Sequence, residues 1–254
     1  MTVAVREIGK ANGIRARLVS YQPDTAYGLH SHSNFYVSIM LLGSMQERTS
    51  MGDEEYLSPH CALMPPDFDH ANLYGRHGAL DLVFDFPHEI LETQFGIRSV
   101  ERNARRIDNT RVAAFVSNIL SKPAEWRGDG LTDLITLALR PQDGVKRSPP
   151  SWLSRARDYF DDDPYSARVA TVADACGVHR VHLVRVFRDF LNMTPTEYRL
   201  QAMTLRAATH LQNEQDGISA IAAKAGFADA SHFAREMRKR SGMSPSTVRR
   251  LFAV

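Results

Sequence analysis

The sequence lacks long apolar segments and contains few cysteines. None of its hydrophobic runs approaches the roughly 18 residues that a membrane-spanning helix needs, and its first residues lack the apolar core of a signal peptide. Two cysteines, Cys61 and Cys176, are too few for a four-cysteine zinc site or a disulfide framework. We therefore expect a cytoplasmic protein with no membrane partner.

Recognisable catalytic patterns are missing as well. The sequence shows no nucleophilic triad, no glycine-rich phosphate loop and no pair of carboxylates with a defensible role. With 43% hydrophobic and 24% charged residues among 254 positions, it is typical of a globular chain of one or two domains. We expect neither enzymatic activity nor a bound cofactor.

Charge is distributed unevenly along the chain. Residues 1–150 contain 16 Lys and Arg against 18 Asp and Glu, whereas residues 151–254 contain 15 against 11. The basic second half suggests an anionic partner. Between the halves, residues 141–150 contain three prolines and one glycine, which is typical of a linker. The predicted division is a domain over 1–140, a linker over 141–150 and a domain over 151–254.

The first 86 residues show the two-residue period of β-strands. Every second residue from Leu80 to Phe86 is apolar, and further short apolar stretches cover 14–21 and 35–42. Turn residues separate such stretches at 51–53 and 65–67. Several short strands joined by turns predict a barrel or a sandwich.

From residue 88 to 140 the apolar period becomes helical. The apolar positions at this spacing are Ile90, Leu91, Phe95, Val112, Phe115, Val116, Ile119, Leu120, Leu131, Leu134, Ile135 and Ala138. Helices of this kind either cap the strands or, in addition, pair with a second copy of the chain in a dimer. The sequence leaves both interpretations open.

An internal repeat of about fifty residues occupies the basic half. Leu183-x-Arg185-x-Phe187-Arg188 recurs as Phe233-x-Arg235-x-Met237-Arg238, and Met193-Thr-Pro195 recurs as Met243-Ser-Pro245. In each copy a short helix precedes a glycine, and a second helix with one apolar and one basic face follows it. This order predicts two helix-turn-helix units. A long helix from Pro195 to about Gln212 joins them.

The repeat resembles the AraC/XylS family of bacterial transcription regulators over about residues 152 to 252. The pattern is longest in the second unit, Ile218-Ser-Ala-Ile-Ala-Ala-Lys-Ala-Gly226-Phe-Ala-Asp-Ala-Ser231-His-Phe233-Ala-Arg235, followed by Ser241-Gly-Met-Ser-Pro245 and Arg249. The chain departs from the family at two positions. His179 stands where the family has a capping serine, and Met237 stands where it has a phenylalanine.

The resemblance implies that the second helix of each unit reads the major groove of double-stranded DNA. Arg185 and Arg235 are the expected guanine contacts, and Arg188, Arg238, Lys239 and Arg240 the expected phosphate contacts. Asp229 and Ala234 are also expected to face outward from the second helix. The predicted DNA-binding residues are Arg180, Val181, His182, Val184, Arg185, Arg188, Ala230, Ser231, His232, Arg235, Arg238 and Lys239.

The first half resembles the cupin-like sensing barrel of the same family. His30 and His32 lie two positions apart, and His70 is expected one or two strands later. Metal-binding cupins pair such histidines with a glutamate, but Tyr36 occupies that position here. These four residues are the predicted effector site, and no metal is assigned. The three histidines have three open interpretations: satisfied structural residues, the wall of an organic effector pocket, and a metal site completed by water.

Other residues of this half are interpreted from their local context. Tyr21, Tyr27, Tyr36, Phe68 and Tyr74 are candidates for aromatic walls of a pocket or for core positions. Cys61 is expected to be buried and inert. His77 and Asp81 are expected to be solvated loop or edge residues.

The combined prediction is an α+β protein with a cupin-like barrel, two or three accompanying helices, and an all-α domain with two helix-turn-helix units. The resemblance implies a sequence-specific regulator, an activator, controlled by a small-molecule effector. It also implies a homodimer and contact with RNA polymerase. Two alternatives stay open: a metal-binding cupin, either sensor or enzyme, fused to a DNA-binding domain, and an architectural DNA binder without an effector.

Overall fold

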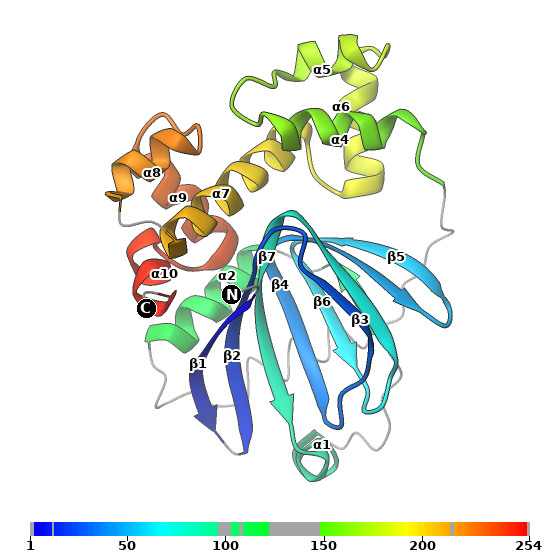
Figure 1. Cartoon of the computed structure of the whole chain (residues 1–254), viewed down its shortest axis with the longest axis vertical. Coiled ribbons are helices and arrows are strands. Elements are labelled where there is room, and N and C mark those ends of the chain that lie inside the picture. Colours follow the sequence, from blue (N-terminus) through cyan, green and yellow to red (C-terminus); the bar gives the residue numbers. More distant parts are fainter. Residues whose placement is uncertain are drawn as a thin grey trace.

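A computed structural model describes residues 3–11, 13–95, 103–106, 109–121, 148–213 and 216–252. A strongly curved β-sheet is followed by a group of helices that sits against one end of the sheet (Figure 1). This arrangement confirms the α+β fold class. The helix expected around 131–138 and most of the expected linker lie outside the described residues, so the division at 141–150 stays a prediction.

The described strands form a single antiparallel sheet. They are β1 (Val3–Ala11), β2 (Ile14–Tyr21), β3 (Ala26–His30), β4 (Phe35–Thr49), β5 (Gly52–Leu57), β6 (His60–Met64), β7 (His70–Phe86) and β8 (Asn103–Arg106). Their order is β1-β2-β7-β4-β6-β8, with β3 paired to β7 and β5 paired to β4. The sheet is thus open among the described strands, and its curvature gives it the cupin-like form.

Alternation along the central strands gives the sheet two different faces. Leu80, Leu82, Phe84 and Phe86 are at most 1% exposed and point into the apolar core, as the period predicts. The residues between them, Asp81 to Asp85 at every second position, point to the opposite face. That face encloses a cavity, so the same strands carry both the core and a candidate ligand site.

Nine helices are described. They are α1 (His88–Phe95), α2 (Asn109–Ser121), α4 (Trp152–Asp162), α5 (Val169–Ala175), α6 (Arg180–Leu191), α7 (Pro195–Asn213), α8 (Ile218–Lys224), α9 (Ala230–Ser241) and α10 (Pro245–Phe252). No helix of the described part is long and apolar enough to cross a membrane. Side chains cap two of these helices: Thr194 and Glu197 form a capping box on α7, and Ser244 accepts a bond from the Thr247 N–H on α10.

Helix α2 connects the sheet to the second helix-turn-helix unit. Its buried Val112, Val116 and Ile119 share one apolar core with strand residues of the sheet and with Phe233 and Met237 of α9. Helix α2 packs directly against α9. It therefore does more than cover the sheet, and whether this region also pairs with a second copy stays a prediction.

Candidate nucleic-acid interface and ligand cavity

In the first unit, a histidine caps the helix that follows the turn. Gly177 has a φ of +69° and lets the chain reverse between α5 and α6. His179 then caps α6, because its Nδ1 accepts the Val181 N–H at 3.3 Å. The imidazole performs the task that a serine hydroxyl has in the family pattern.

Helix α6 separates an apolar face from a basic one. Leu183, Val186 and Phe187 are buried against α4 and α7. The predicted reading residues lie on the other face: Arg180, Val181, Arg185 and Arg188 are exposed, while His182 and Val184 are half-buried. The Nη2 of Arg185 lies 3.0 Å from the Nδ1 of His182, so these two side chains support each other at the surface.

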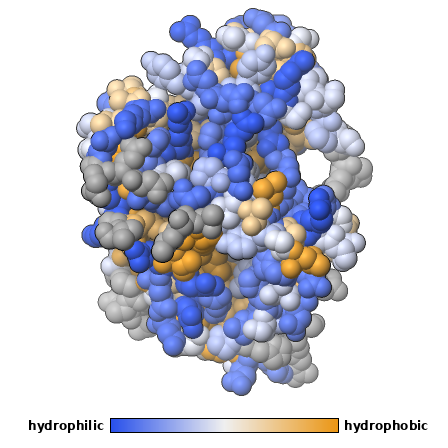
Figure 2. Space-filling model, in the orientation of Figure 1, coloured by the Kyte–Doolittle hydropathy of each residue, from blue (hydrophilic) through white to orange (hydrophobic). Residues whose placement is uncertain are grey.

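Helix α9 repeats this arrangement. Asp229 is exposed, as expected, and it caps the helix because its Oδ1 accepts the His232 N–H at 2.6 Å. Ser231, Arg235, Arg238 and Lys239 are exposed, and Ala230, His232 and Ala234 are half-buried. Figure 2 shows that hydrophilic residues predominate on the visible face of the helical part.

The expected phosphate contact at Arg240 is wrong. Its side chain is 4% exposed, and its Nη2 lies 3.2 Å from the Glu236 carboxylate one turn earlier. Burial lowers the pKa of this guanidinium, and Glu236 opposes that change. Helical periodicity explains the error, because Arg240 falls three residues after Met237 and returns to the core side of α9.

Helix α7 holds the two units apart. It has 19 residues, which corresponds to a length of about 28 Å. Figure 1 shows α5 and α6 near one of its ends and α8 and α9 near the other. Because buried residues of α7 pack into both units, it acts as a spacer of fixed length.

The second site is a cavity of about 270 Å³ on the concave face of the sheet. Its walls come from the side chains that alternate with the core residues, among them Arg17, Tyr36 and Asp81. Tyr21, Tyr27 and Tyr74 add aromatic surface, and the Tyr21 and Tyr74 rings stack with centroids 3.7 Å apart. Phe68 does not line the cavity; its ring lies 6.3 Å from that of His70.

The predicted effector residues come together at this cavity. His30, His32 and Tyr36 line it, and His70 lies directly behind them with 1% of its surface exposed. Each of the three histidines offers a ring nitrogen within 4.8 Å of the other two. The Tyr36 hydroxyl lies 3.3 Å from the Nε2 of His70. Burial lowers the pKa values of His32 and His70, which favours neutral imidazoles.

The expectation that Asp81 and His77 are solvated is wrong. Asp81 is 3% exposed, accepts a bond from the Ser38 hydroxyl at 3.2 Å, and has no partner for its second oxygen. Burial raises the pKa of Asp81 to about 7. Burial lowers the pKa of His77, whose Nε2 lies 3.7 Å from Asp161 of α4. Cys61 is fully buried, as expected.

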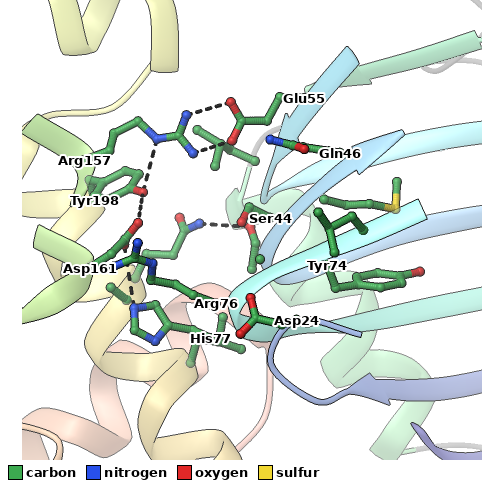
Figure 3. A pocket seen from close by; sticks show the side chains of 18 of the residues that line it. Asp24, Ser44, Gln46, Glu55, Tyr74, Arg76, His77, Arg157, Asp161 and Tyr198 are labelled. Atoms are coloured by element: carbon green, nitrogen blue, oxygen red, sulfur yellow. Dashed lines mark hydrogen bonds and ion pairs between the residues drawn. The ribbon is translucent and has the colours of Figure 1, made fainter. Parts of the chain in front are cut away.

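Sequence reasoning missed a polar cluster between the sheet and helices α4 and α7. Around a second cavity of about 210 Å³, Arg157 of α4 is paired with Glu55 of β5 and bonded to Tyr198 of α7 (Figure 3). The Tyr198 hydroxyl donates to Asp161 at 2.9 Å. These partners are up to 102 positions apart in the chain, so no local sequence pattern predicts their contacts.

The helical part of the chain is similar to known proteins. The family of helix-turn-helix domains matches residues 172–251. A probable transcription factor PqrA from Proteus vulgaris is 33% identical over 82 residues, covering 32% of this chain and 67% of PqrA. The transcriptional activator RhaS from Pectobacterium carotovorum is 32% identical over 87 residues, or 34% of this chain and 31% of RhaS. The match covers about a third of the longer relatives.

A solved AraC-type regulator from Chromobacterium violaceum is similar at a TM-score of 0.39 and 26% identity, over 40% of this chain and 91% of that one. Two helix-turn-helix units on one long helix define a class of DNA-binding domain. The chain belongs to the AraC family of transcription regulators. The relatives found are regulators and not enzymes, which agrees with the expectation from sequence.

Proposed function

We propose that this chain is a sequence-specific transcription regulator that reads DNA with α6 and α9. The observation that carries the proposal is the matched pair of exposed arginines, Arg185 and Arg235, at equivalent positions of two helices held apart by α7. The length of α7, about 28 Å, approaches the roughly 34 Å between successive major-groove faces of one helical turn.

The two helices read DNA with different stringency. Arg185 has the two-pronged donor geometry that discriminates guanine, and Arg180 and His182 extend the polar surface of α6. Helix α9 offers mostly small side chains, Ala230, Ser231 and Ala234, around Arg235. Arg188, Arg238 and Lys239 supply phosphate contacts, which position the protein without specifying sequence. Base changes in the half-site of α6 therefore cost more affinity than changes in the half-site of α9.

The sheet cavity is the proposed effector site. It combines aromatic walls with a few polar groups, the composition of small-molecule pockets. Its volume of about 270 Å³ suits a small organic molecule. The activator role follows the name of the relative RhaS, and a homodimer and contact with RNA polymerase follow the family resemblance.

Replacement of Arg185 tests the reading role. Arg185→Ala is expected to cost about 1–3 kcal/mol of binding free energy on a selected operator and much less on random DNA. The operator is first selected from a random pool with the full chain, and affinities are then measured by fluorescence anisotropy. Arg48→Ala, on the β4–β5 hairpin, removes the same charge far from α6 and serves as control. Equal losses on both DNAs make Arg185 a phosphate contact.

The effector role is tested by thermal melting of the full chain against sugars, amino acids and aromatic acids. A ligand at a hundredfold its dissociation constant adds about 2.7 kcal/mol of stability. Tyr36→Ala, in the cavity wall, is expected to remove the shift, whereas Tyr159→Ala on the surface of α4 keeps it. A ligand that stabilises both variants equally binds elsewhere.

A further inference from the structure

We propose that His30, His32 and His70 form a binding site for one divalent transition-metal ion at the wall of the sheet cavity. Their three candidate ligand nitrogens lie within 4.8 Å of one another. Two features of the backbone bring the three histidines together. His30 of β3 pairs with His70 of β7 across the sheet, and His32 follows two residues after His30.

Hydrogen bonds orient two of the three rings for coordination. The Nδ1 of His30 lies 2.8 Å from the Gly28 carbonyl oxygen, and the Nδ1 of His70 lies 2.9 Å from the Phe68 carbonyl oxygen. Because a carbonyl only accepts, each Nδ1 carries the proton and each Nε2 presents a lone pair. Histidines that bind metals are held in this way, with the second ring nitrogen donating to a backbone carbonyl.

The neighbouring groups leave the histidines as the principal ligands. The Asp85 carboxylate lines the same cavity, but both of its oxygens are bonded to Arg17 at 2.7 Å. The Tyr36 hydroxyl lies 3.3 Å from the Nε2 of His70 and serves as the partner of that nitrogen in the metal-free protein. Three imidazole ligands leave further coordination positions for water or for an oxygen of a molecule in the cavity.

The chemistry of the ligands selects the class of metal. Neutral imidazoles suit Zn²⁺, Co²⁺, Ni²⁺ and Cu²⁺, whereas Mg²⁺ and Ca²⁺ prefer oxygen ligands. A tetrahedral zinc site with bonds of about 2.0 Å places its nitrogens about 3.3 Å apart, so the cluster contracts on binding. His32 provides this movement, since its side chain is exposed after the end of β3, whereas His70 is buried and fixed.

This inference is independent of the proposed regulatory role, because metal binding is measured without DNA. The full chain, with any polyhistidine tag removed, is stripped with a chelator and titrated with Co²⁺ near neutral pH. We expect one Co²⁺ per chain by elemental analysis, a visible absorption band of nitrogen-ligated Co²⁺, and displacement of Co²⁺ by Zn²⁺.

Variants assign the ligands. His32→Ala leaves the fold intact because its side chain is exposed, and it weakens Co²⁺ binding at least about tenfold. The double variant His30→Ala, His32→Ala removes the absorption band. His210→Ala, on α7, removes a histidine outside the cluster and leaves Co²⁺ affinity unchanged. The proposal is overturned if the wild-type chain binds no Co²⁺ below millimolar concentrations, or if the folded double variant binds it as tightly as the wild type.

Discussion

Asp81 lies in a buried environment, although its sequence context suggests a solvated one. A single aspartate in a strand of apolar residues, Leu80 to Phe86, is easily taken for an edge position. It instead lies at the centre of β7, between β2 and β4, and faces the cavity. The pKa of the carboxyl rises from 3.8 to about 7 because burial disfavours its charged form, with the Ser38 hydroxyl opposing the rise.

This raised pKa makes stability depend on pH. The folded state holds the Asp81 proton more tightly than the unfolded chain, so the free energy of unfolding falls as pH rises from about 4 to about 7. Asp81→Asn is a neutral replacement of nearly the same shape. It is expected to match the wild type near pH 4 and to exceed its stability above pH 7, by on the order of 4 kcal/mol.

Urea unfolding at a series of pH values measures this difference. Asp53→Asn, on the exposed β4–β5 hairpin, is the control and is expected to keep the pH slope of the wild type. If Asp81→Asn also keeps that slope, the carboxyl is solvated in the folded protein and the cavity is open to water there.

Some properties of single residues could be predicted from the sequence, and others could not. Exposure of Arg185 and Arg235 followed from helix periodicity, which is a local property. The meeting of His30 and His32 with His70, which lies on another strand, was expected from the family resemblance. Burial of Asp81 depends on which strands flank β7, and burial of His77 depends on α4, which lies more than seventy positions later. Such contacts are set by tertiary packing, which the sequence pattern does not contain.

At the scale of elements, the contact between α2 and α9 links the sheet to the second reading unit. Gly242 ends α9 with a φ of +72°, and a Cβ built on it would clash with the Ala113 carbonyl oxygen of α2. Gly177, in the turn of the first unit, has a similar φ of +69° but no atom within 4 Å of such a Cβ. Substitution of Gly177 therefore tests backbone strain alone, whereas substitution of Gly242 tests backbone strain together with helix packing.

The loss of stability on alanine substitution at each glycine measures the two effects. Gly177→Ala is expected to lose about 1–2 kcal/mol, the penalty of a left-handed conformation for a residue with a Cβ. Gly242→Ala carries the same penalty and in addition forces α2 away from α9, so its loss is larger by about 1 kcal/mol or more. Urea unfolding gives both values. Equal losses mean that α2 does not approach α9 in solution.

The elements themselves were largely predictable. Strands β2, β4 and β7 cover the expected stretches, because the two-residue period is strong where one face meets the core. The tandem units were predictable because the repeat supplies the same evidence twice. The packing of α2 on α9 was not, since an apolar helix face does not name its partner.

At the scale of the whole molecule, two of the contacts between the sheet and the helical part differ in character. Helix α2 and the second unit share apolar core. Helix α4, which packs with the first unit, meets the sheet at the buried Leu57 of β5 and through the polar cluster of Arg157, Glu55, Asp161 and His77. Tyr74 lines both the effector cavity and the cavity of this cluster. An apolar contact tolerates little movement, while a hydrated polar one separates at lower cost. The polar cluster is therefore the contact through which cavity occupancy is expected to change the placement of α6 relative to α9.

Glu55→Gln tests this difference. It keeps the shape of the side chain but removes the ion pair with Arg157, which is partly screened by solvent and worth about 1 kcal/mol. Opening of the first unit from the sheet is then expected about fivefold more often, so amide hydrogens of α4 and β5 exchange faster while those of α2 and α9 keep wild-type rates. Asp53→Asn on the same hairpin is the control. Faster exchange in all four elements after Glu55→Gln means that both contacts open together, and the two reading helices then move as one body.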